Sequence, residues 1–324
     1  MALWMTYDTI LNTTKPFRAP GIQTGREVDA LAEILQVVCP EGSITVGISP
    51  VSPLIFPDNI VDAILAVARY GLTLGPLPCP ILGATAPMSI AGGLVQQNAE
   101  VIASIVMAQL IKPGLPIIYK GRLSVMDPRS GLSVWGNPEI GLISAATVEI
   151  GHYYGMPVDV YGLSTNAHTM DIQNGYERTL NALTPVLAGA DEISGVGEME
   201  GGLSSSLAQI VIDDEVLSSI HRLHSGFEVN HDSLGIEVIS RVMKKSRNFL
   251  AEKHTIKYLR SNEVLQTKLA DRKTWSQWED SGKNTLTERA ENQARHHLKE
   301  HEILPLNQDQ MAGLDEVVQY FTGG

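Results

Sequence analysis

One segment of the chain gathers several side chains that can bind or orient a small polar molecule. These side chains lie in the segment 162–177 and are Asn166, His168, Asp171 and Gln173. A β-rich run precedes the segment and a helical pattern follows it, so we expect these side chains at the end of a strand. A histidine can carry a proton or anchor a ligand by hydrogen bonds. The alternative is that Asn166 or Thr169 caps the helix and His168 is an ordinary surface residue.

Aromatic side chains form a second group with possible chemistry. Trp135 stands just before a predicted helix start, and Tyr161 ends the β-rich run before segment 162–177. Aromatic ring faces attract quaternary ammonium groups by cation–π interaction. We therefore predict that Trp135 and Tyr161 are walls of a cation-binding site. A packing role for Trp135 in its loop is an equally good interpretation.

Repeated elements must position these residues. Six β-rich runs are each followed by a helical pattern, and they are Lys15–Ala19, Ile44–Ile48, Leu72–Gly75, Pro116–Lys120, Pro157–Tyr161 and Asp191–Val196. Such alternation predicts a parallel sheet. Polar or glycine-rich loops follow nearly every run, and no GxGxxG motif follows the first, which favours a (β/α)8 TIM-type barrel over an open doubly wound sheet. With about six strand–helix units, the barrel is predicted to be incomplete.

Charge divides the chain into two regions. Residues 1–226 carry 10 Lys and Arg against 21 Asp and Glu, whereas residues 227–324 carry 14 against 15. We predict barrel units over 1–226 and a charged, helical carboxyl-terminal region over 227–324, packing on the barrel or at an oligomer interface. Trp275 and Trp278 are expected to anchor that region by burial.

Composition excludes several classes of function. The net charge of −12 argues against nucleic-acid binding, and two cysteines cannot form a disulfide framework or a cysteine-rich zinc site. No metal-binding spacing, P-loop or Gly-x-Ser-x-Gly motif occurs. The longest apolar run, Ala99–Ile111, contains Glu100 and is too short for a membrane span. We expect no metal, no membrane and a cytoplasmic location, since the amino terminus lacks the pattern of a signal peptide.

Several longer motifs resemble the trimethylamine methyltransferase family, in the order that the family has them. They are LNTTKP (11–16), LPCPILGATAPMSIAGGLVQQNAE (77–100), YKGRLSVMDPRSG (119–131), the segment 171–177, IVIDDEVL (210–217), FEVNHDSL (227–234), NFLAEKHTIKYLR (248–260) and LADRKTWSQWEDSG (269–282). The resemblance runs from about Leu11 to the end of the chain. Family members have a long amino-terminal segment before LNTTKP with the first barrel strands, and this chain starts almost at that motif, in agreement with six units.

The resemblance implies a (β/α)8 barrel that moves a methyl group from a methylated amine to cobalt(I) of a corrinoid, which a small partner protein carries. No cofactor is then bound directly. The motif NAHTMD (166–171) resembles the branch without pyrrolysine, which includes glycine betaine methyltransferases, and His168 takes the place of that special residue or lies very near it. Glycine betaine is the substrate we favour; trimethylamine, proline betaine, carnitine and γ-butyrobetaine stay open. We also expect a homo-oligomer.

The implied roles follow residue by residue. Trp135 and Tyr161 would hold the cation, Asn166, His168 and Gln173 would orient a substrate carboxylate, and Asp171 would order the loop or contact His168. His168 is the candidate catalytic residue, although the reaction abstracts no proton. Two other hypotheses remain: an inactive truncated homologue or corrinoid-binding scaffold, and a lyase or aldolase that uses Lys120 as a Schiff-base lysine.

Overall fold

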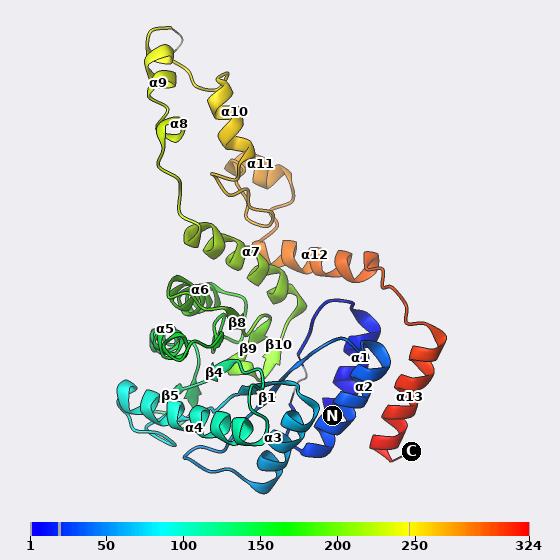
Figure 1. The fold of residues 1–324 in the computed structure, drawn as a ribbon. Helices are drawn as coiled ribbons and strands as arrows, with labels where there is room; N and C mark the ends of the chain where they lie inside the picture. Colours follow the sequence, from blue (N-terminus) through cyan, green and yellow to red (C-terminus); the bar gives the residue numbers. More distant parts are fainter. Residues whose placement is uncertain (1, 19–20, 246, 324) are drawn as a thin grey trace. The chain divides into compact units, whose positions relative to one another are not determined.

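The structure, a computed structural model, describes residues 2–18, 21–245 and 247–323, and the chain divides into two compact units (Figure 1). The first unit takes residues 1–206 and 295–324, and the second takes residues 207–294. This division differs from the predicted single boundary near Phe227 at both of its ends. The last helix of the chain accounts for one difference, because it packs in the first unit.

Five parallel strands form the centre of the first unit. They are β1 (Thr45–Ile48), β2 (Thr73–Pro76), β4 (Tyr119–Gly121), β7 (Val158–Tyr161) and β8 (Glu192–Ser194). Neighbours along the chain pair in parallel, and a bridge between Leu74 and Ile117 joins β2 to the strand that continues into β4. The predicted alternation is therefore confirmed for five of the six runs. Over the described residues the series begins at β1 and ends at β8 without closing, and the incomplete TIM-type barrel stays a prediction.

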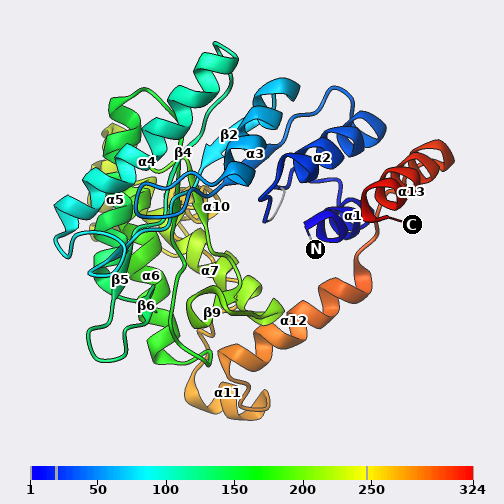
Figure 2. The ribbon, with the colours of Figure 1, turned by 90° about the horizontal axis from the view of Figure 1, so that it is seen from below.

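The connecting helices follow each strand in turn and lie along the strands (Figure 2). They are α3 (Asp58–Tyr70), α4 (Ile90–Ile111), α5 (Pro138–Tyr153) and α6 (Ile172–Leu187). Short strands lie within the polar and glycine-rich loops predicted after the β-rich runs. They are β3 (Ile81–Leu82), β5 (Ser124–Met126), β6 (Ser133–Val134), β9 (Glu198–Met199) and β10 (Ser204–Ser205). A 3-10 turn, η1 (Glu200–Gly202), separates the last two.

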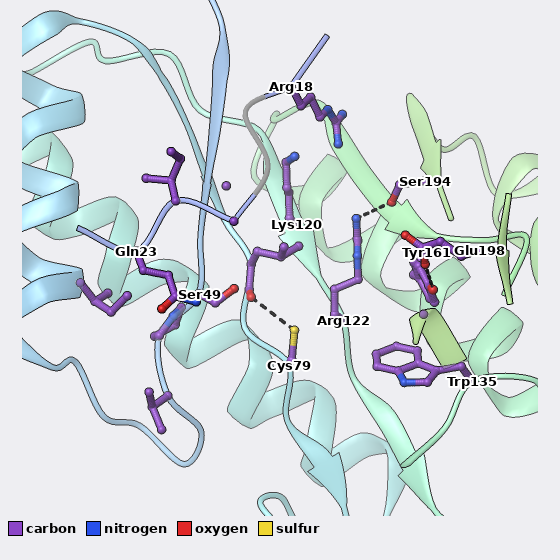
Figure 3. Close-up of a pocket in the computed structure, with 18 of the residues that line it drawn as sticks. Arg18, Gln23, Ser49, Cys79, Lys120, Arg122, Trp135, Tyr161, Ser194 and Glu198 are labelled. Atoms are coloured by element: carbon purple, nitrogen blue, oxygen red, sulfur yellow. Dashed lines mark hydrogen bonds between the residues drawn. The ribbon is translucent and has the colours of Figure 1, made fainter. Parts of the chain in front are cut away.

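The first predicted strand, Lys15–Ala19, was wrong over Lys15–Arg18, where the chain has no strand; Ala19 lies outside the described residues. Pro16 has no N–H to give to a ladder, and the backbone N–H of Lys15 donates instead to Thr13 Oγ1 over 3.1 Å. The segment brings Arg18 to Asp159, beside the ends of the parallel strands (Figure 3).

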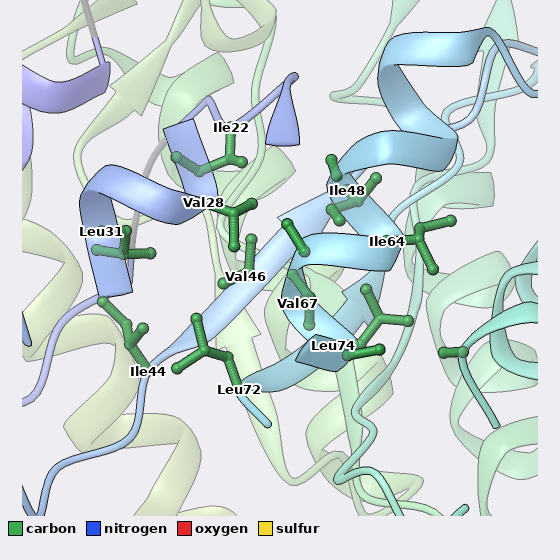
Figure 4. Packing of buried hydrophobic residues seen from close by; sticks show 14 of the residues in the cluster. Ile22, Val28, Leu31, Ile44, Val46, Ile48, Ile64, Val67, Leu72 and Leu74 are labelled. Atoms are coloured by element: carbon green, nitrogen blue, oxygen red, sulfur yellow. The ribbon is translucent and has the colours of Figure 1, made fainter. Parts of the chain in front are cut away.

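The largest core cluster fills the space between strands β1 and β2 and the helices α2 (Gly25–Val38) and α3 (Figure 4). Val46 and Leu74 on the strands, Val28 on α2 and Val67 on α3 each have 0% of their surface exposed. A capping box begins α2, since Thr24 and Glu27 each accept the other's backbone N–H group. A capped amphipathic helix therefore seals this side of the sheet.

The carboxyl-terminal helix belongs to the first unit. Helix α13 (Gln308–Thr322) packs with α1 (Ala2–Asn12) and α2 around a cluster that includes Ile34 and Leu314, both with 0% exposure. Gln310 Nε2 also donates to the backbone oxygen of Val38 over 3.2 Å. The two ends of the chain are thus joined by an apolar core.

The second unit is helical, and many of its large apolar side chains are exposed, among them Phe227, Leu250 and Trp275. Its helices are α7 (Leu207–His224), α8 (His231–Leu234), α9 (Ile236–Met243), α10 (Lys253–Arg260), α11 (Trp275–Asp280) and much of α12 (Leu286–Glu300). The Glu215 carboxylate on α7 accepts the backbone N–H groups of residues 268–270 at 3.0–3.3 Å. The expected burial of Trp275 was wrong, because this residue is 71% exposed, whereas Trp278 is half-buried. The two indole rings lie 5.1 Å apart between centroids.

Helix α4 holds a buried polar group that ties it to a loop. Over the described residues it is the one helix long and apolar enough to cross a membrane by length and composition, a test that core helices also pass. Glu100 on α4 has 0% exposure and accepts hydrogen bonds from Ser52 Oγ at 2.8 Å, the Leu54 N–H at 2.9 Å and Gln96 Nε2 at 3.1 Å. Glu100 therefore holds the loop that follows β1.

Replacing Glu100 by Ala is expected to lower the free energy of unfolding by about 2 kcal/mol, because it removes three hydrogen bonds to a buried carboxylate. Urea denaturation followed by circular dichroism measures this change. Glu149→Ala on the exposed face of α5 is the matched control and should change the free energy of unfolding by less than about 0.5 kcal/mol. Equal effects of the two substitutions would contradict the anchoring role.

Candidate functional site

A cavity of about 810 Å3 lies at the carboxyl ends of the parallel strands (Figure 3). Each strand contributes a lining residue at or just beyond its end, and these are Ser49 after β1, Leu77 after β2, Arg122 after β4, Tyr161 on β7 and Ser194 on β8. Parallel α/β folds place their ligands at this edge of the sheet. The cavity has the size of an ordinary small-molecule site.

A buried cluster of charged side chains adjoins this cavity, and three of its cations line it. Asp159 on β7 has 0% exposure, and its Oδ2 lies 2.9 Å from Lys120 Nζ while its Oδ1 lies 2.8 Å from Arg122 Nη2. Arg18 pairs with both Asp159 and Glu192. Strand register explains the meeting, because Lys120 on β4 and Glu192 on β8 are the neighbours of Asp159 in the sheet.

The cluster is charged at neutral pH. Burial lowers the pKa of Lys120 to about 8, and the Asp159 carboxylate opposes that shift. Burial raises the pKa of Asp159, but Arg122, Lys120 and Arg18 together outweigh it and hold that pKa well below its usual range. Three cations therefore surround one buried carboxylate.

Arg122 connects the ion cluster to the aromatic residues. Its Nη1 donates to the backbone oxygens of Gly121 at 3.0 Å and Asp159 at 3.2 Å, and its Nη2 donates to Ser194 Oγ at 2.6 Å. The guanidinium carbon lies 5.6 Å from the centroid of the Tyr161 ring. The position of Arg122 is thus fixed from several strands at once.

Trp135 and Tyr161 form an aromatic corner of the same cavity. Their rings meet edge to face with 4.9 Å between centroids, and both residues line the cavity. The Tyr161 hydroxyl donates to the Glu198 carboxylate, and burial followed by this carboxylate raises the pKa of Tyr161 far above its usual value. Buried Arg178 on α6 donates to the backbone oxygens of Glu198 and Gly195 and so holds the β8–β9 connection in place.

Asn166 acts on the position of Trp135. Its Oδ1 accepts the backbone N–H groups of Trp135 at 2.6 Å and Gly136 at 2.8 Å. Glu177 on α6 holds Asn166 in turn, by accepting its backbone N–H at 3.0 Å. A Cβ atom at Gly136 would come within 2.1 Å of Glu177 Oε2, so this close approach requires glycine.

A second cavity of about 880 Å3 adjoins the other side of Trp135. Trp135, Asn166, His168 and Gln173 line it, whereas Asp171 lines neither cavity. The His168 side chain is 75% exposed, with Nδ1 3.6 Å from Glu200 Oε1. Glu200 has a left-handed φ of 54°, which is uncommon for a residue other than glycine.

The structure gives Gln173 and Asp171 local partners. Gln173 Nε2 donates to Glu177 Oε1 at 2.8 Å. Asp171 is the N-cap of α6 and accepts the N–H of Asn174 at 3.2 Å, which lowers the pKa of Asp171. The alternative in which Asn166 or Thr169 caps this helix was wrong, since Asp171 takes that position.

The sequence analysis missed Arg18, Arg122, Asp159 and Glu198 as site residues and considered Lys120 for Schiff-base chemistry alone. A signal for part of the cluster exists, because Lys120 and Arg122 flank a glycine at a strand end and Asp159 interrupts an apolar strand. Over the described residues, no group of three or more His, Cys, Asp or Glu side chains could hold a metal ion.

Comparison with known proteins gives consistent matches along the chain. A family model described as Trimethylamine methyltransferase (MTTB) matches residues 2–320. The trimethylamine methyltransferase MttB of Methanosarcina barkeri (strain Fusaro / DSM 804) is 35% identical over 271 residues, which are 83% of this chain and 54% of that protein. The chain therefore spans about half the length of this relative.

Two relatives from Desulfitobacterium hafniense match a longer part of the chain. Trimethylamine methyltransferase MttB of strain DSM 10664 / DCB-2 is 30% identical over 319 residues, 96% of this chain and 64% of that protein. Glycine betaine methyltransferase of strain Y51 is 30% identical over 309 residues, 93% of this chain and 63% of that protein. Proteins with two different methylated substrates in their names thus match at the same level of identity.

Replacing Asp159 by Asn is expected to lower the free energy of unfolding by about 3–5 kcal/mol at pH 7, because three cations lose their buried counter-ion. The folded pKa of Asp159 lies below the unfolded value of about 4, so its stabilisation is present above that pH and is lost as the pH falls further. The difference between wild type and variant should therefore shrink between pH 6 and pH 2.5 in urea denaturation.

Asp127→Asn is the matched control, since Asp127 pairs with Arg129 at the surface. Its effect on the free energy of unfolding should be much smaller than that of Asp159→Asn, because solvent screens a surface ion pair. A pH-independent difference between wild type and Asp159→Asn would contradict the charge assignment of the cluster.

Proposed function

The chain belongs to the trimethylamine methyltransferase family, and we propose that it transfers a methyl group from a methylated amine to the cobalt of a corrinoid carried by another protein. The observation that carries this proposal is the aromatic corner. Trp135 and Tyr161 meet at 4.9 Å inside a cavity at the strand ends, with the Glu198 carboxylate beside them. A quaternary ammonium group has no N–H to donate in a hydrogen bond, so aromatic ring faces and a carboxylate are the groups that attract it.

Glycine betaine is the substrate we propose. One of the relatives is named a glycine betaine methyltransferase, and the cavity contains cationic as well as aromatic side chains. In the proposed reaction the C–N bond breaks and its electron pair stays on nitrogen, which gives dimethylglycine. The cobalt(I) acceptor supplies the electron pair of the new Co–C bond. No proton transfer is needed, so the protein's work is to bind and orient the methyl donor.

The roles of individual residues follow from their contacts. Trp135 would face the ammonium group, because the ring of Tyr161 is already covered by Arg122. Asn166 would be a positioning residue that acts through Trp135, since its carboxamide oxygen already accepts two backbone N–H groups. His168 lines the second cavity, which also adjoins Trp135, and its exposed side chain would contact the methyl donor or the incoming corrinoid protein from there.

The partner, the assembly and the location are parts of the same proposal. We propose a cognate corrinoid protein as methyl acceptor, self-association into a homo-oligomer, and a cytoplasmic location. The chain spans about half to two thirds of the relatives named above, so the full activity of those proteins comes to this chain as a proposal only. A scaffold that binds the corrinoid protein without turnover is the alternative within this family.

A Schiff-base enzyme is the second candidate, favoured by one observation. Lys120 lies on β4 and lines the cavity. Burial lowers its pKa to about 8, so a fraction of it is the neutral, nucleophilic amine near neutral pH. Its ion pair with Asp159 opposes deprotonation, so we prefer the methyltransferase. Borohydride reduction in the presence of a carbonyl substrate, followed by mass spectrometry of the Lys120 peptide, tests this alternative.

Purified protein with cob(I)alamin should form methylcobalamin when glycine betaine is offered, with trimethylamine, proline betaine and carnitine in parallel reactions. The methyl donor then sits beside Trp135 and the acceptor approaches from solvent. The change in the visible absorption spectrum of the corrinoid measures the reaction. Soluble, folded protein that gives no methylcobalamin with any of these amines would favour the scaffold hypothesis.

Replacing His168 by Ala should reduce the rate of methylcobalamin formation at least about tenfold if this side chain contacts either reactant at the mouth. The same absorption assay measures the rate. His296→Ala on α12 is the control, an exposed histidine whose loss should leave the rate unchanged. A near-native rate in His168→Ala would remove His168 from the proposed site.

A further inference from the structure

We propose that Lys120, supported by Arg122, binds the carboxylate of a zwitterionic methylated amine and so selects carboxylate-bearing donors over simple amines. This inference rests on the proposed function, because it concerns the same cavity. It differs from the roles implied by family resemblance, which gave carboxylate binding to Asn166, His168 and Gln173. Those residues line the second cavity, where the amide groups of Asn166 and Gln173 already have protein partners.

The charge on the cavity wall supports this assignment. Arg18, Lys120 and Arg122 line the cavity, and Glu198 is the one carboxylate among its lining residues. The counter-ions Asp159 and Glu192 are not lining residues, and Asp159 has 0% exposure. Lys120 and Arg122 therefore line the cavity, whereas the Asp159 carboxylate that balances them does not.

Lys120 has donors available for a ligand. Its ammonium group carries three N–H bonds, and its contact in the described part of the chain is Asp159 Oδ2 at 2.9 Å. The side chain is only 3% exposed, so bulk water has little access to the remaining donors. A buried ammonium group with one protein partner is stabilised by a further anionic acceptor.

Arg122 places the anionic and cationic ends of the ligand next to each other. Its guanidinium lies 5.6 Å from the ring centroid of Tyr161, which itself lies 4.9 Å from that of Trp135 (Figure 3). Its hydrogen bonds to backbone oxygens and Ser194 keep it from swinging away. Adjacent sites of opposite preference suit a molecule whose ammonium and carboxylate are separated by a short spacer, such as glycine betaine.

The charge state of Lys120 gives the site a pH dependence. The groups that face its ammonium are Asp159, Arg18 and Arg122, and burial together with these cations lowers its pKa to about 8 despite the carboxylate. The ammonium form prevails below that pH and is lost above it. The affinity for a ligand that carries a carboxylate should accordingly fall between pH 7 and pH 9. The affinity for a trimethylammonium ligand without a carboxylate should stay the same over this range.

Isothermal titration calorimetry at pH 7 tests the inference with two ligands. Glycine betaine carries the carboxylate, and choline carries the same trimethylammonium group with a hydroxyl in its place. Lys120→Met should raise the Kd for glycine betaine roughly 10- to 100-fold and change the Kd for choline less than about twofold. Trp135→Ala should weaken both ligands, because both need the aromatic wall.

Two further variants keep the test decisive. Lys120→Gln removes the charge but keeps a polar side chain, and it replaces Lys120→Met if the methionine variant does not fold. The same loss of affinity for glycine betaine is expected in both variants. Lys112→Met is the matched control on an exposed lysine and should bind both ligands as wild type does. Circular dichroism and urea denaturation confirm that each variant is folded.

Three outcomes would overturn the inference. An unchanged Kd for glycine betaine in Lys120→Met or Lys120→Gln would exclude the contact, and equal loss of glycine betaine and choline would indicate general damage to the site. Wild type that binds neither ligand would overturn both this inference and the proposed substrate. If the wild-type protein binds glycine betaine through Lys120 but never methylates cob(I)alamin, the carboxylate-binding role of Lys120 is supported and the proposed methyltransferase activity is contradicted.

Discussion

The buried carboxylate of Asp159 is the interaction on which the site depends. It sits inside a strand with no exposed surface, and three cations from two other segments of the chain surround it. Isolated, any of these charges would be costly at the centre of a sheet; together they neutralise most of one another's desolvation penalty. The arrangement leaves cations facing the cavity and the acid behind them. The register of the sheet thus brings the charges together, and their pairing gives this part of the cavity its polarity.

A second set of contacts fixes the aromatic wall without touching the cavity contents. Glu177 holds Asn166, and Asn166 holds the backbone of Trp135 and Gly136. These residues come from α6, from the loop after β7 and from the loop before α5, so three separate segments meet at one indole ring. Rigid support of this kind is what a site needs when its task is to orient a methyl group rather than to move a proton.

Periodicity was sufficient to predict five of the strands and the helices between them, because buried strands and amphipathic helices have strong local signals. It failed at Lys15–Arg18, where Pro16 breaks a β-rich run. Trp135 and Tyr161 could be named as candidate wall residues from the sequence, since both are aromatic and each lies next to a predicted strand end or helix start. The Asp159 cluster could not, because it depends on register between β4, β7 and β8, which the sequence does not specify. The boundary with the helical region was missed for a similar reason, as α13 packs on residues almost three hundred positions earlier.

That packing of α13 has a consequence for how the chain is made. Ile34 and Leu314 share one apolar cluster, yet the whole of residues 207–294 is synthesised between them. During translation α1 and α2 leave the ribosome with one face uncovered, and α13, which covers that face, emerges only after residues 207–294. The intervening unit can fold while the first one waits. Long-range closure of this type slows folding and prolongs exposure of apolar surface, which makes the nascent chain a natural client for chaperones.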